Sequence, residues 1–523
     1  MPKGLGNFIF KLLTSSPSIH RYLNKKVVSS FTDSGPLSGL YSTKGSEKTS
    51  LWEILDKEFF ALEVPEPKPG EIASLPNLEE VLALFERKGP VTKSRVSVLL
   101  PFFAQHLTDA VFQSDGQFGT DAPHEIILNQ IYGNTPGDEA LLRSGQDGKL
   151  KTQTRIVNGR EAEYPDALCE KKGDHWAIKK EYEGLSYFKG TDKATTLLDK
   201  YKDKEGELCA TGLFQGNMTL GNFAITSLLV REHNRLCDGI RSELGSAGDD
   251  EIFRIAQQNN VTAYMKVVIE DYINAFAGQK MFILDTKSFF HEEKRWCRET
   301  AIPYHFNILY RLHSMMPDGL IGLEEMGFAA MGANNGLVMA KGLGEIFEIA
   351  SRQSASRVSL GNTHEKLLAA DRAGVVKGRQ KLGSFNSHKE VQQEGSSVGF
   401  EAFDPNFRSA LSRLYGGDPN RVEYTVGTLA ELPKPGVLEK LGIKDEPIIG
   451  PTLMNAIGKH AFRHILSNRF MSREYLNPKV MTEFGWKSLH ETASVSDLVK
   501  RNVSGEMDQA QAEKLKVGFS HPV

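Results

Sequence analysis

The stretch that decides the fold of this chain is Tyr310-Arg311-Leu312-His313-Ser314-Met315-Met316-Pro317-Asp318. Its tyrosine and histidine are three residues apart, so on a helix they share one face, with about 5–6 Å between their β-carbons. An imidazole is a common metal ligand, and a phenol beside it can serve as a redox-active group. Because Tyr-x-x-His is a short pattern, the surrounding residues must decide whether it forms a metal site.

The segment from Phe306 to Asp318 resembles the proximal helix of the cyclooxygenases and plant α-dioxygenases, members of the animal-type haem peroxidase superfamily. The run that starts at Tyr310 is more similar to the α-dioxygenase version of this motif. The resemblance implies that His313 is the proximal ligand of a haem iron. It also implies that Tyr310 is the catalytic residue that becomes a tyrosyl radical.

A second informative segment is Pro101-Phe102-Phe103-Ala104-Gln105-His106-Leu107-Thr108-Asp109. It resembles the distal helix of the cyclooxygenases, where Gln105 matches the distal glutamine and Asp109 replaces the distal histidine. O–O cleavage depends on a distal base that takes a proton from peroxide and returns it to the leaving oxygen. A carboxylate can do this if a dry pocket raises its pKa. Alternatively, Asp109 merely pairs with a nearby cation.

Helical geometry separates His106 from these two distal side chains. Gln105 and Asp109 are four residues apart and face the same way, whereas His106 is rotated from Gln105 by roughly 100°. We therefore do not expect His106 to replace the missing distal histidine.

A third segment resembles the Arg-Glu-His-Asn-Arg helix of the superfamily: Leu229-Val230-Arg231-Glu232-His233-Asn234-Arg235-Leu236-Cys237-Asp238. Arg231 and Arg235 are one helical turn apart and can form a buried ion-pair lattice with Glu232 or other acids. Without the resemblance, the same residues would indicate only a charged helix face. We expect the segment to be structural rather than catalytic.

Further segments match the family in order over about residues 50–490. Residues 350–357 resemble the Phe-Ser-Arg-Gln-x-Ala-x-Arg helix of the cyclooxygenases, and Ser384-Phe385-Asn386 resembles a Phe-Asn turn of the superfamily. The resemblance implies that Asn386 is a cofactor-site residue that bonds the second ring nitrogen of His313 and so sets its tautomer. The alternative is that Asn386 is an ordinary turn residue.

The family pattern breaks near the C-terminus. Ala461 stands where cyclooxygenases have the serine that aspirin acetylates, and its neighbours His460 and Arg463 are more polar than the family's apolar channel. The arginine that grips the fatty-acid carboxylate has no clear equivalent, and Lys25, Lys26 or Arg463 are the candidates. Prostaglandin-type double oxygenation is therefore not predicted.

Composition restricts the class of protein and its compartment. The chain has 523 residues, 25% charged and 40% hydrophobic, with a formal net charge of −3, which disfavours nucleic-acid binding. Its four cysteines are scattered without CxxC spacing, which indicates free thiols in a reducing compartment. We expect a cytoplasmic or peripheral membrane protein, because no stretch resembles a spanning helix or a good signal peptide. The apolar segment 4–13 predicts either a helix that covers the core or an interfacial helix that makes peripheral membrane contact.

Apolar periodicity predicts a mainly α fold. The resemblance implies that this is the animal-type haem peroxidase fold, with haem between the distal and proximal helices. We expect an N-terminal extension at residues 1–49 and a catalytic domain at residues 50–523. The predicted helices are 101–111, 224–240, 252–275, 303–316, 343–351 and 450–466. The predicted loops are 32–49, 63–76, 113–124, 158–208 and 375–402.

These features together predict a haem b-dependent fatty-acid dioxygenase that forms lipid hydroperoxides by a tyrosyl-radical mechanism. Its partners would be an unsaturated or saturated fatty acid, molecular oxygen and peroxide. The alternatives are a haem peroxidase that oxidises small reductants, and a haem-binding protein with weakened catalysis. The sequence leaves open the oxygenated carbon and the oligomeric state.

Overall fold

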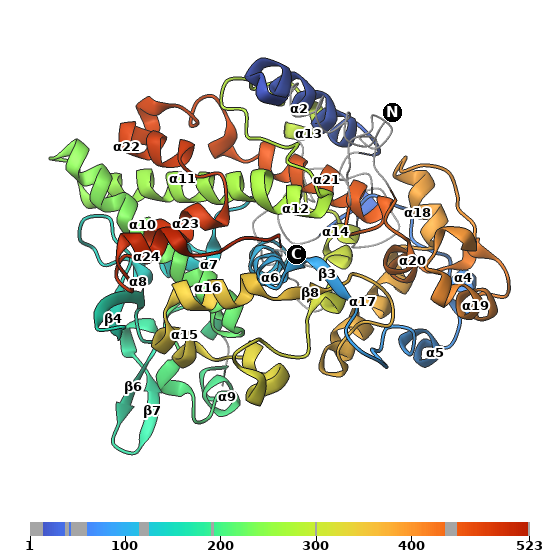
Figure 1. Cartoon of the computed structure of the whole chain (residues 1–523), viewed down its shortest axis with the longest axis horizontal. Helices are drawn as coiled ribbons and strands as arrows, with labels where there is room; N and C mark the ends of the chain where they lie inside the picture. The colour runs from blue at the N-terminus through green and yellow to red at the C-terminus, as the bar shows by residue number, and fades with distance from the viewer. Residues whose placement is uncertain are drawn as a thin grey trace.

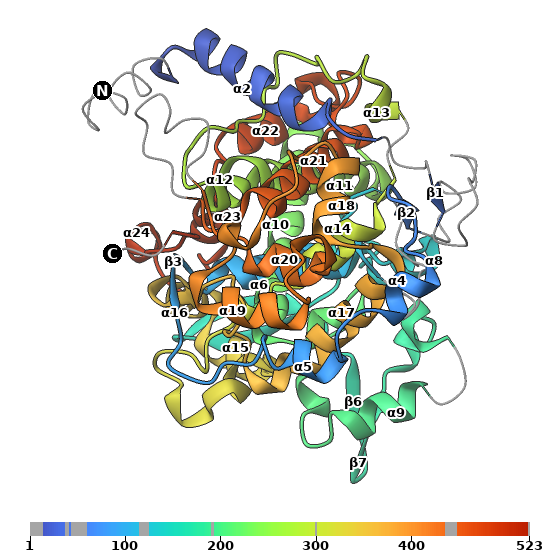
Figure 2. The same ribbon diagram turned by 90° about the vertical axis from the view of Figure 1, so that its right-hand side faces the viewer.

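The computed structural model of this protein describes residues 14–36, 41–42, 60–113, 125–189, 193–298, 301–434 and 447–520. Helices dominate this part of the chain, and its strands form only two-stranded antiparallel ladders. Figures 1 and 2 show the helices packed around α10 and α6, with the β6–β7 hairpin projecting from one end. The prediction of a mainly α fold is confirmed.

The helices that build the centre of the molecule are α6 (Leu99–Val111), α10 (Leu220–Leu244), α11 (Asp249–Val267), α12 (Ile273–Ala277), α14 (Tyr304–Leu309), α16 (Leu343–Arg352), α17 (Leu368–Lys381) and α21 (Pro451–Leu466). Those that surround them include α2 (Pro17–Thr32), α8 (Pro136–Leu142), α9 (Lys193–Lys200), α18 (Phe385–Val391), α19 (Pro405–Leu414), α20 (Tyr424–Ala430), α22 (Pro478–His490) and α23 (Val495–Asn502). The strands are β1 (Tyr41–Ser42), β2 (Ala61–Leu62), β3 (Lys93–Ser97), β4 (Thr152–Val157), β5 (Arg160–Pro165), β6 (Cys169–Lys172), β7 (His175–Ile178) and β8 (Ser354–Ser356).

Most of the predicted helices are present, but the one at residues 303–316 is wrong. Helix α14 ends at Leu309, and a separate 3-10 turn begins at His313. Met316 has extended backbone, with φ −78° and ψ 127°, as expected for a residue that precedes proline. A single helix through this segment is therefore excluded, so Tyr310 and His313 do not share a helix face.

Four of the predicted loops contain regular structure. Residues 32–49 include β1, and residues 63–76 include the short helix α4 (Pro69–Ala73). Residues 158–208 include β5, β6, β7 and α9, and residues 375–402 include the second half of α17 and all of α18. The β4–β5 hairpin turns at Asn158 and Gly159, whose φ values are +52° and +76°. An Asn-Gly pair with positive φ at both positions is typical of a two-residue hairpin turn, so this signal was available in the sequence.

The predicted ion-pair lattice on α10 is confirmed. The carboxylate of Glu232 accepts hydrogen bonds from Arg235 at 2.9 Å and from Arg501 at 2.5–3.0 Å. Arg231 donates to the buried carboxylate of Glu506 at 2.7 Å. Burial alone would raise the pKa of Glu232, but the two arginines outweigh it and lower this pKa to about 2. The lattice therefore fastens α10 to α23 through paired, buried charges.

We expect Glu232→Gln to destabilise the protein by roughly 3–5 kcal/mol, because it leaves two arginines beside a neutral partner in the interior. Since the pKa of Glu232 is lowered in the folded state, its contribution to stability is present above its ordinary pKa near 4.5. That contribution is lost as the pH falls toward 2. Urea unfolding at neutral and acidic pH measures both effects. Equal stability of the variant and the wild type at pH 7 would contradict this interpretation.

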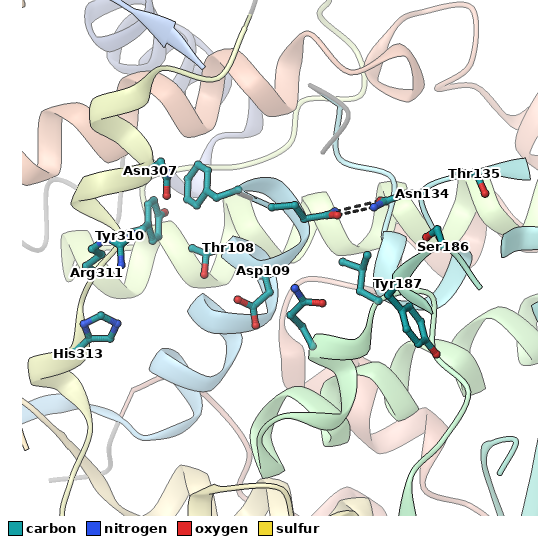
Figure 3. A pocket seen from close by; sticks show the side chains of 14 residues that line it. Thr108, Asp109, Asn134, Thr135, Ser186, Tyr187, Asn307, Tyr310, Arg311 and His313 are labelled. Carbon is teal, nitrogen blue, oxygen red and sulfur yellow. Dashed lines mark hydrogen bonds between the residues drawn. The ribbon is translucent and has the colours of Figure 1, made fainter. Parts of the chain in front are cut away.

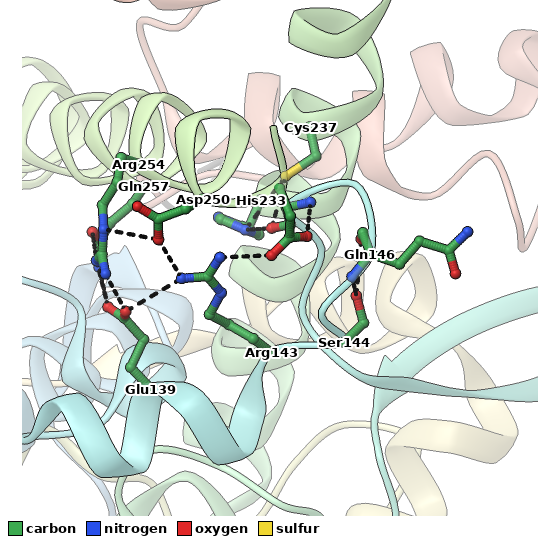
Figure 4. A network of polar contacts seen from close by, with 11 residues as sticks. Glu139, Arg143, Ser144, Gln146, His233, Cys237, Asp250, Arg254 and Gln257 are labelled. Atoms are coloured by element: carbon green, nitrogen blue, oxygen red, sulfur yellow. Dashed lines mark hydrogen bonds and ion pairs between the residues drawn. The ribbon is translucent and has the colours of Figure 1, made fainter. Parts of the chain in front are cut away.

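A second polar network joins the segment after α8 to the start of α11 (Figure 4). Arg143 donates to Asp249 and Asp250, each at 2.7 Å. Arg254, one turn further along α11, donates to both carboxylate oxygens of Glu139. Such a partly exposed lattice orients the elements around α10 rather than creating a chemical site.

Helix α2 lies along α21 (Figure 2). Arg463 holds the C-terminal end of α2. The guanidinium donates to the carbonyl oxygens of Thr32, Ser34 and Pro36 at 2.9–3.0 Å. Arg463 is one of the three candidates for binding the fatty-acid carboxylate. These bonds occupy its guanidinium with backbone carbonyl groups. The predicted N-terminal helix at 4–13 lies outside the described residues. Every helix within the described ranges is too short or too polar to cross a membrane.

Candidate active site

The distal side chains are held by the first turn of α10. Thr219 caps this helix and its hydroxyl donates to Gln105 at 3.0 Å, while the amide of Asn222 donates to the Asp109 carboxylate at 2.8 Å. A Cβ at Gly221 would lie 2.3 Å from the ring of Phe102, so only glycine allows α10 to approach α6 this closely. The sequence placed Gln105 and Asp109 correctly on one face of α6.

Asp109 is the titratable residue on this face of α6. Its carboxyl group is half-buried at the edge of a cavity, and desolvation raises its pKa from 3.8 to about 7, although hydrogen bonds with Gln105 and Asn222 oppose the rise. A group with this pKa can bind and release a proton near neutral pH. His106 points elsewhere, with Nδ1 3.1 Å from the hydroxyl of Tyr264, so the prediction that it does not substitute is confirmed.

The proximal side is formed by the segment that follows α14. Nδ1 of His313 lies 2.6 Å from Oδ1 of Asp371 on α17. Because a carboxylate accepts hydrogen bonds, this contact places the imidazole proton on Nδ1 and leaves Nε2 to act as a metal ligand. The His313 side chain is 25% exposed, so it is open to the adjoining cavity although Asp371 is buried.

The predicted contact between Asn386 and His313 is wrong. The Asn386 side chain donates to the carbonyl of Val398 and to Asn420, each at 2.9 Å, and accepts from the amide of Val398. These bonds satisfy the carboxamide within its own turn region, so Asn386 is a local structural residue. Asp371 takes the position beside His313 that the sequence assigned to Asn386.

We expect Asp371→Asn to keep the fold but to weaken electron donation from His313 to a bound iron, because a neutral amide replaces the carboxylate that accepts the imidazole N–H. The reaction with peroxide should slow by roughly tenfold to a hundredfold, and the reduction potential should become more positive. Stopped-flow kinetics and redox titration measure these changes. Asp318→Asn, at an exposed carboxylate, is the control. Identical kinetics and potential in the Asp371 variant and wild type would contradict the assigned role.

A cavity of about 750 Å³ lies between the distal and proximal sides (Figure 3). Asp109 faces it from α6, and His313 and Tyr310 face it from the segment after α14. This volume is typical of cofactor sites. The residues present fit a haem, because a pocket of that size offers one oriented imidazole nitrogen and a proton-accepting carboxyl group. The lining residues are Thr108, Asp109, Phe112, Gln113, Asn134, Thr135, Ser186, Tyr187, Leu213, Gln215, Asn307, Tyr310, Arg311 and His313.

A second, apolar cavity lies on the other side of Tyr310. It has about 20 Å³ of free space, and its wall includes Val111, Ile465 and Ala461. Thr108, Phe112 and Tyr310 line both cavities, so the tyrosine stands between the larger polar space and the smaller apolar one. Ala461, which sequence counting aligned with the family's serine, is therefore close to Tyr310 in the apolar wall.

The phenol of Tyr310 is held in an aromatic, almost dry setting. Its ring packs edge-to-face on Phe306, with centroids 5.0 Å apart, and lies 5.8 Å from Phe112. Its hydroxyl makes no hydrogen bond of normal geometry with any described residue, although an interaction with Tyr272 shifts the pKa of both phenols. Burial outweighs the effect of Tyr272 and raises the pKa of Tyr310 well above 10, so the residue is a neutral phenol at physiological pH.

Sequence reasoning missed four contributors to this site. Asp371, Tyr272 and Asn222 lie on helices whose periodicity marks only their packing, and Tyr187 lies in a segment predicted to be a loop. The local sequence Ile269-Glu270-Asp271-Tyr272 contains no signal that Tyr272 interacts with Tyr310. Tertiary packing alone brings these side chains to the cavity.

Comparisons with known proteins agree with this arrangement. The family model described as animal haem peroxidase matches residues 124–334. Prostaglandin G/H synthase 2 of Bos taurus is 26% identical over 525 aligned positions, which cover 96% of this chain and 79% of that protein. The fatty acid α-dioxygenase of Arabidopsis thaliana has a similar fold, with a TM-score of 0.70, 14% identity and coverage of 97% and 89%.

A fatty acid α-dioxygenase of Oryza sativa, solved with palmitic acid, has a TM-score of 0.67 at 13% identity, covering 95% of this chain and 92% of that chain. The resemblance to the cyclooxygenases and α-dioxygenases that the motifs predict is thus confirmed by sequence and by fold. Residues 124–334 therefore match the animal haem peroxidase family model, within a fold similar to that of the fatty acid α-dioxygenases.

Proposed function

We propose that this protein is a haem b-dependent fatty-acid dioxygenase that forms lipid hydroperoxides through a radical on Tyr310. The observation that carries the proposal is the position of this tyrosine, whose side chain lines both the polar cavity beside His313 and the apolar cavity beside Ala461. A phenol in that position can exchange an electron with a cofactor on one side and a hydrogen atom with an alkyl chain on the other.

His313 would hold the haem from the proximal side, with its tautomer set by Asp371. When bound, haem supplies the one-electron oxidising chemistry that peroxide drives. On the opposite side, Asp109 accepts the proton of the incoming hydroperoxide and returns it to the departing oxygen. Gln105, held by Thr219, completes the polar surface next to this carboxyl group.

Tyr310 then carries the oxidising equivalent to the substrate. Its phenol loses one electron and its hydroxyl proton, and the resulting phenoxyl radical removes a hydrogen atom from a C–H bond of the fatty acid. Molecular oxygen adds to the carbon radical, and a hydrogen atom returned from Tyr310 converts the peroxyl radical to a hydroperoxide. The aromatic wall of Phe306 and Phe112 excludes water, which protects the phenoxyl radical from side reactions.

The substrate would be an unsaturated or saturated fatty acid, in line with the α-dioxygenase relatives and the palmitic acid bound to one of them. The apolar cavity offers only about 20 Å³, so an alkyl chain must displace side chains of its wall on binding. Such a substrate is collected from lipid surfaces, which favours a cytoplasmic protein with peripheral membrane contact. Prostaglandin-type double oxygenation is not part of this proposal.

Oxygen uptake by the hemin-reconstituted protein tests the proposal. With linoleate or palmitate and a trace of peroxide, we expect oxygen consumption and a hydroperoxide product identified by mass spectrometry. Guaiacol oxidation without any fatty-acid product would instead identify a peroxidase of small reductants. A protein that binds haem and leaves peroxide unchanged would be a haem-binding protein with lost catalysis, and either outcome rejects the dioxygenase.

Peroxide reduction should depend on pH through Asp109. Since burial raises its pKa to about 7, the carboxylate that accepts the proton forms as the pH rises through 7. We therefore expect kcat/KM for peroxide to rise about tenfold per pH unit below 7 and to level off above it. Asp109→Asn should remove this inflection and lower the rate by roughly 10²–10⁴-fold.

Asn222→Ala is the informative companion variant, since the hydrogen bond from Asn222 lowers the pKa of Asp109. Its removal should move the inflection to higher pH without abolishing it. If Asp109→Asn kept the wild-type pH profile, the carboxyl group would lie outside the proton path.

A further inference from the structure

A buried cluster of three metal-ligand side chains lies on the far side of α14 from the polar cavity. Glu63 follows β2, His305 belongs to α14, and His460 belongs to α21. One candidate ligand atom from each lies within 4.8 Å of the others. Their exposed fractions are 0%, 1% and 2%, so the donors converge in the interior rather than at the surface.

The contacts inside the cluster are those of converging donors. Nε2 of His305 and Nε2 of His460 face each other at 2.8 Å, and Oε2 of Glu63 is 3.8 Å from the latter nitrogen. The amide of Gln392 donates to the same Glu63 oxygen at 3.3 Å and so orients the carboxylate. An outer hydrogen bond of this kind commonly supports a ligand in metal sites.

A third imidazole stands next to the cluster. The ring of His388 on α18 lies 4.7 Å from that of His305, and both of its nitrogens are buried without a hydrogen-bond partner among the described residues. Nδ1 of His305 is also unpartnered in this part of the chain. A buried polar atom without a partner costs about 1–3 kcal/mol, so the imidazoles of this region are not fully satisfied by the described side chains.

Two positive charges lie close to the cluster, and each has partners of its own. Lys459 donates to the carbonyl and side-chain oxygens of Gln392 at 3.2 and 2.9 Å and lies 3.9 Å from Glu394. Arg463 donates to three carbonyl oxygens at the end of α2. Neither cation points a hydrogen bond at the facing imidazole nitrogens, so these remain available as donors.

We propose that Glu63, His305 and His460 form a binding site for a zinc-class divalent transition-metal ion, with two imidazole nitrogens and one carboxylate oxygen as its protein ligands. Two or three imidazole nitrogens with one carboxylate oxygen are a donor set that Zn²⁺ prefers in tetrahedral geometry. With Zn–N bonds of about 2.0–2.1 Å, neighbouring ligand nitrogens lie roughly 3.3 Å apart. The facing nitrogens of His305 and His460 must therefore separate by a few tenths of an ångström from their hydrogen-bonded distance.

This site is separate from the polar cavity, but the ring of Phe306 connects it to Tyr310. The ring of Phe306 lies 5.3 Å from that of His460 and 5.0 Å from that of Tyr310. Neither His305 nor Glu63 lines either cavity described above. An ion here would lock α14 to α21 and to the segment after β2, and so would fix the helix whose end carries the tyrosine. The inference does not depend on the proposed oxygenase function.

Zinc content of the haem-loaded full-length protein tests the site. After incubation with Zn²⁺ and removal of the excess, we expect about one zinc per chain by mass spectrometry, apart from the haem iron. His305→Gln and His460→Gln should each lower this content by about tenfold or more. His291→Gln removes a buried imidazole that bonds the carbonyl of Met471, so this matched control should keep the zinc.

Thermal unfolding gives an independent reading. Chelation should lower the Tm of the wild-type protein and zinc should restore it, whereas His460→Gln should not respond. Should the variants fail to fold, anomalous scattering at the zinc edge from crystals of the wild type decides the matter. A peak among Glu63, His305 and His460 supports the site. Wild-type protein without zinc, zinc retained by both histidine variants, or a peak only elsewhere would overturn it.

Discussion

Tyr310→Phe is expected to abolish fatty-acid-dependent oxygen uptake, by on the order of a thousandfold or more, while the protein still binds haem and reduces peroxide. Phenylalanine keeps the ring and its packing on Phe306 and Phe112 but has no O–H bond to give up. A loss of that size corresponds to an increase of at least about 4 kcal/mol in the activation barrier. A change in packing does not explain this increase, because the two rings have the same shape. Oxygen-electrode traces with linoleate measure the loss of oxygen uptake. Guaiacol oxidation in the same preparation measures the peroxide reduction that remains.

Tyr272→Phe is the matched control. Its ring is as deeply buried, and its phenol interacts with that of Tyr310, but it lines neither of the two cavities. We expect oxygen uptake to stay within about tenfold of wild type, because only the pKa of Tyr310 changes. If Tyr310→Phe left oxygen uptake intact, or if both variants lost it equally, the radical would not belong to Tyr310.

His313→Gly is expected to lower hemin affinity by on the order of a hundredfold or more and to remove the Soret band of a histidine-ligated haem. The variant deletes an imidazole that both lines the polar cavity and is oriented by a carboxylate. Because the deletion leaves an imidazole-sized space, free imidazole at millimolar concentration should restore part of the spectrum. Hemin titration followed by absorption measures both effects.

His364→Gly is the control for the histidine deletion. Its ring stacks on Phe328 with centroids 4.1 Å apart, away from the polar cavity. We expect wild-type hemin affinity and no response to imidazole. If the His313 variant bound hemin as tightly as this control, His313 would not be the proximal ligand.

The distal half of the site follows from the sequence because it depends on local geometry. Helix α6 is regular, so a separation of four residues places Gln105 and Asp109 on one face and turns His106 to the other. The raised pKa of Asp109 follows from the apolar character of this helix, which made burial of the carboxyl group foreseeable.

The proximal half could be predicted only in part. The motif located Tyr310 and His313, but periodicity extended the helix through a segment where the backbone breaks before His313. The partner of that histidine, Asp371, lies 58 residues further along the chain, and no local pattern marks this single acidic residue of α17 as the partner. Asn386 was assigned by resemblance to a turn, and its bonds lie within that turn region instead.

The histidine cluster behind α14 was equally invisible in the sequence. His305 and His460 are 155 residues apart, and Glu63 comes from a third segment near the start of the chain. Glu63 and His305 are polar residues between apolar neighbours, whereas His460 lies among other polar and charged residues of its segment. No local pattern marks the three as ligands of one ion. Only the approach of α14, α21 and the segment after β2 turns them into a candidate ligand set.

Electron–nuclear double resonance on the ferric, hemin-loaded protein tests the central claim most directly, with histidine nitrogens isotopically labelled. We predict strong coupling of the iron spin to one axial histidine nitrogen in the wild type. That coupling should be lost in His313→Gly and kept in His364→Gly. A wild-type spectrum without an axial histidine nitrogen, or the same coupling in His313→Gly, would contradict the placement of haem between His313 and Asp109.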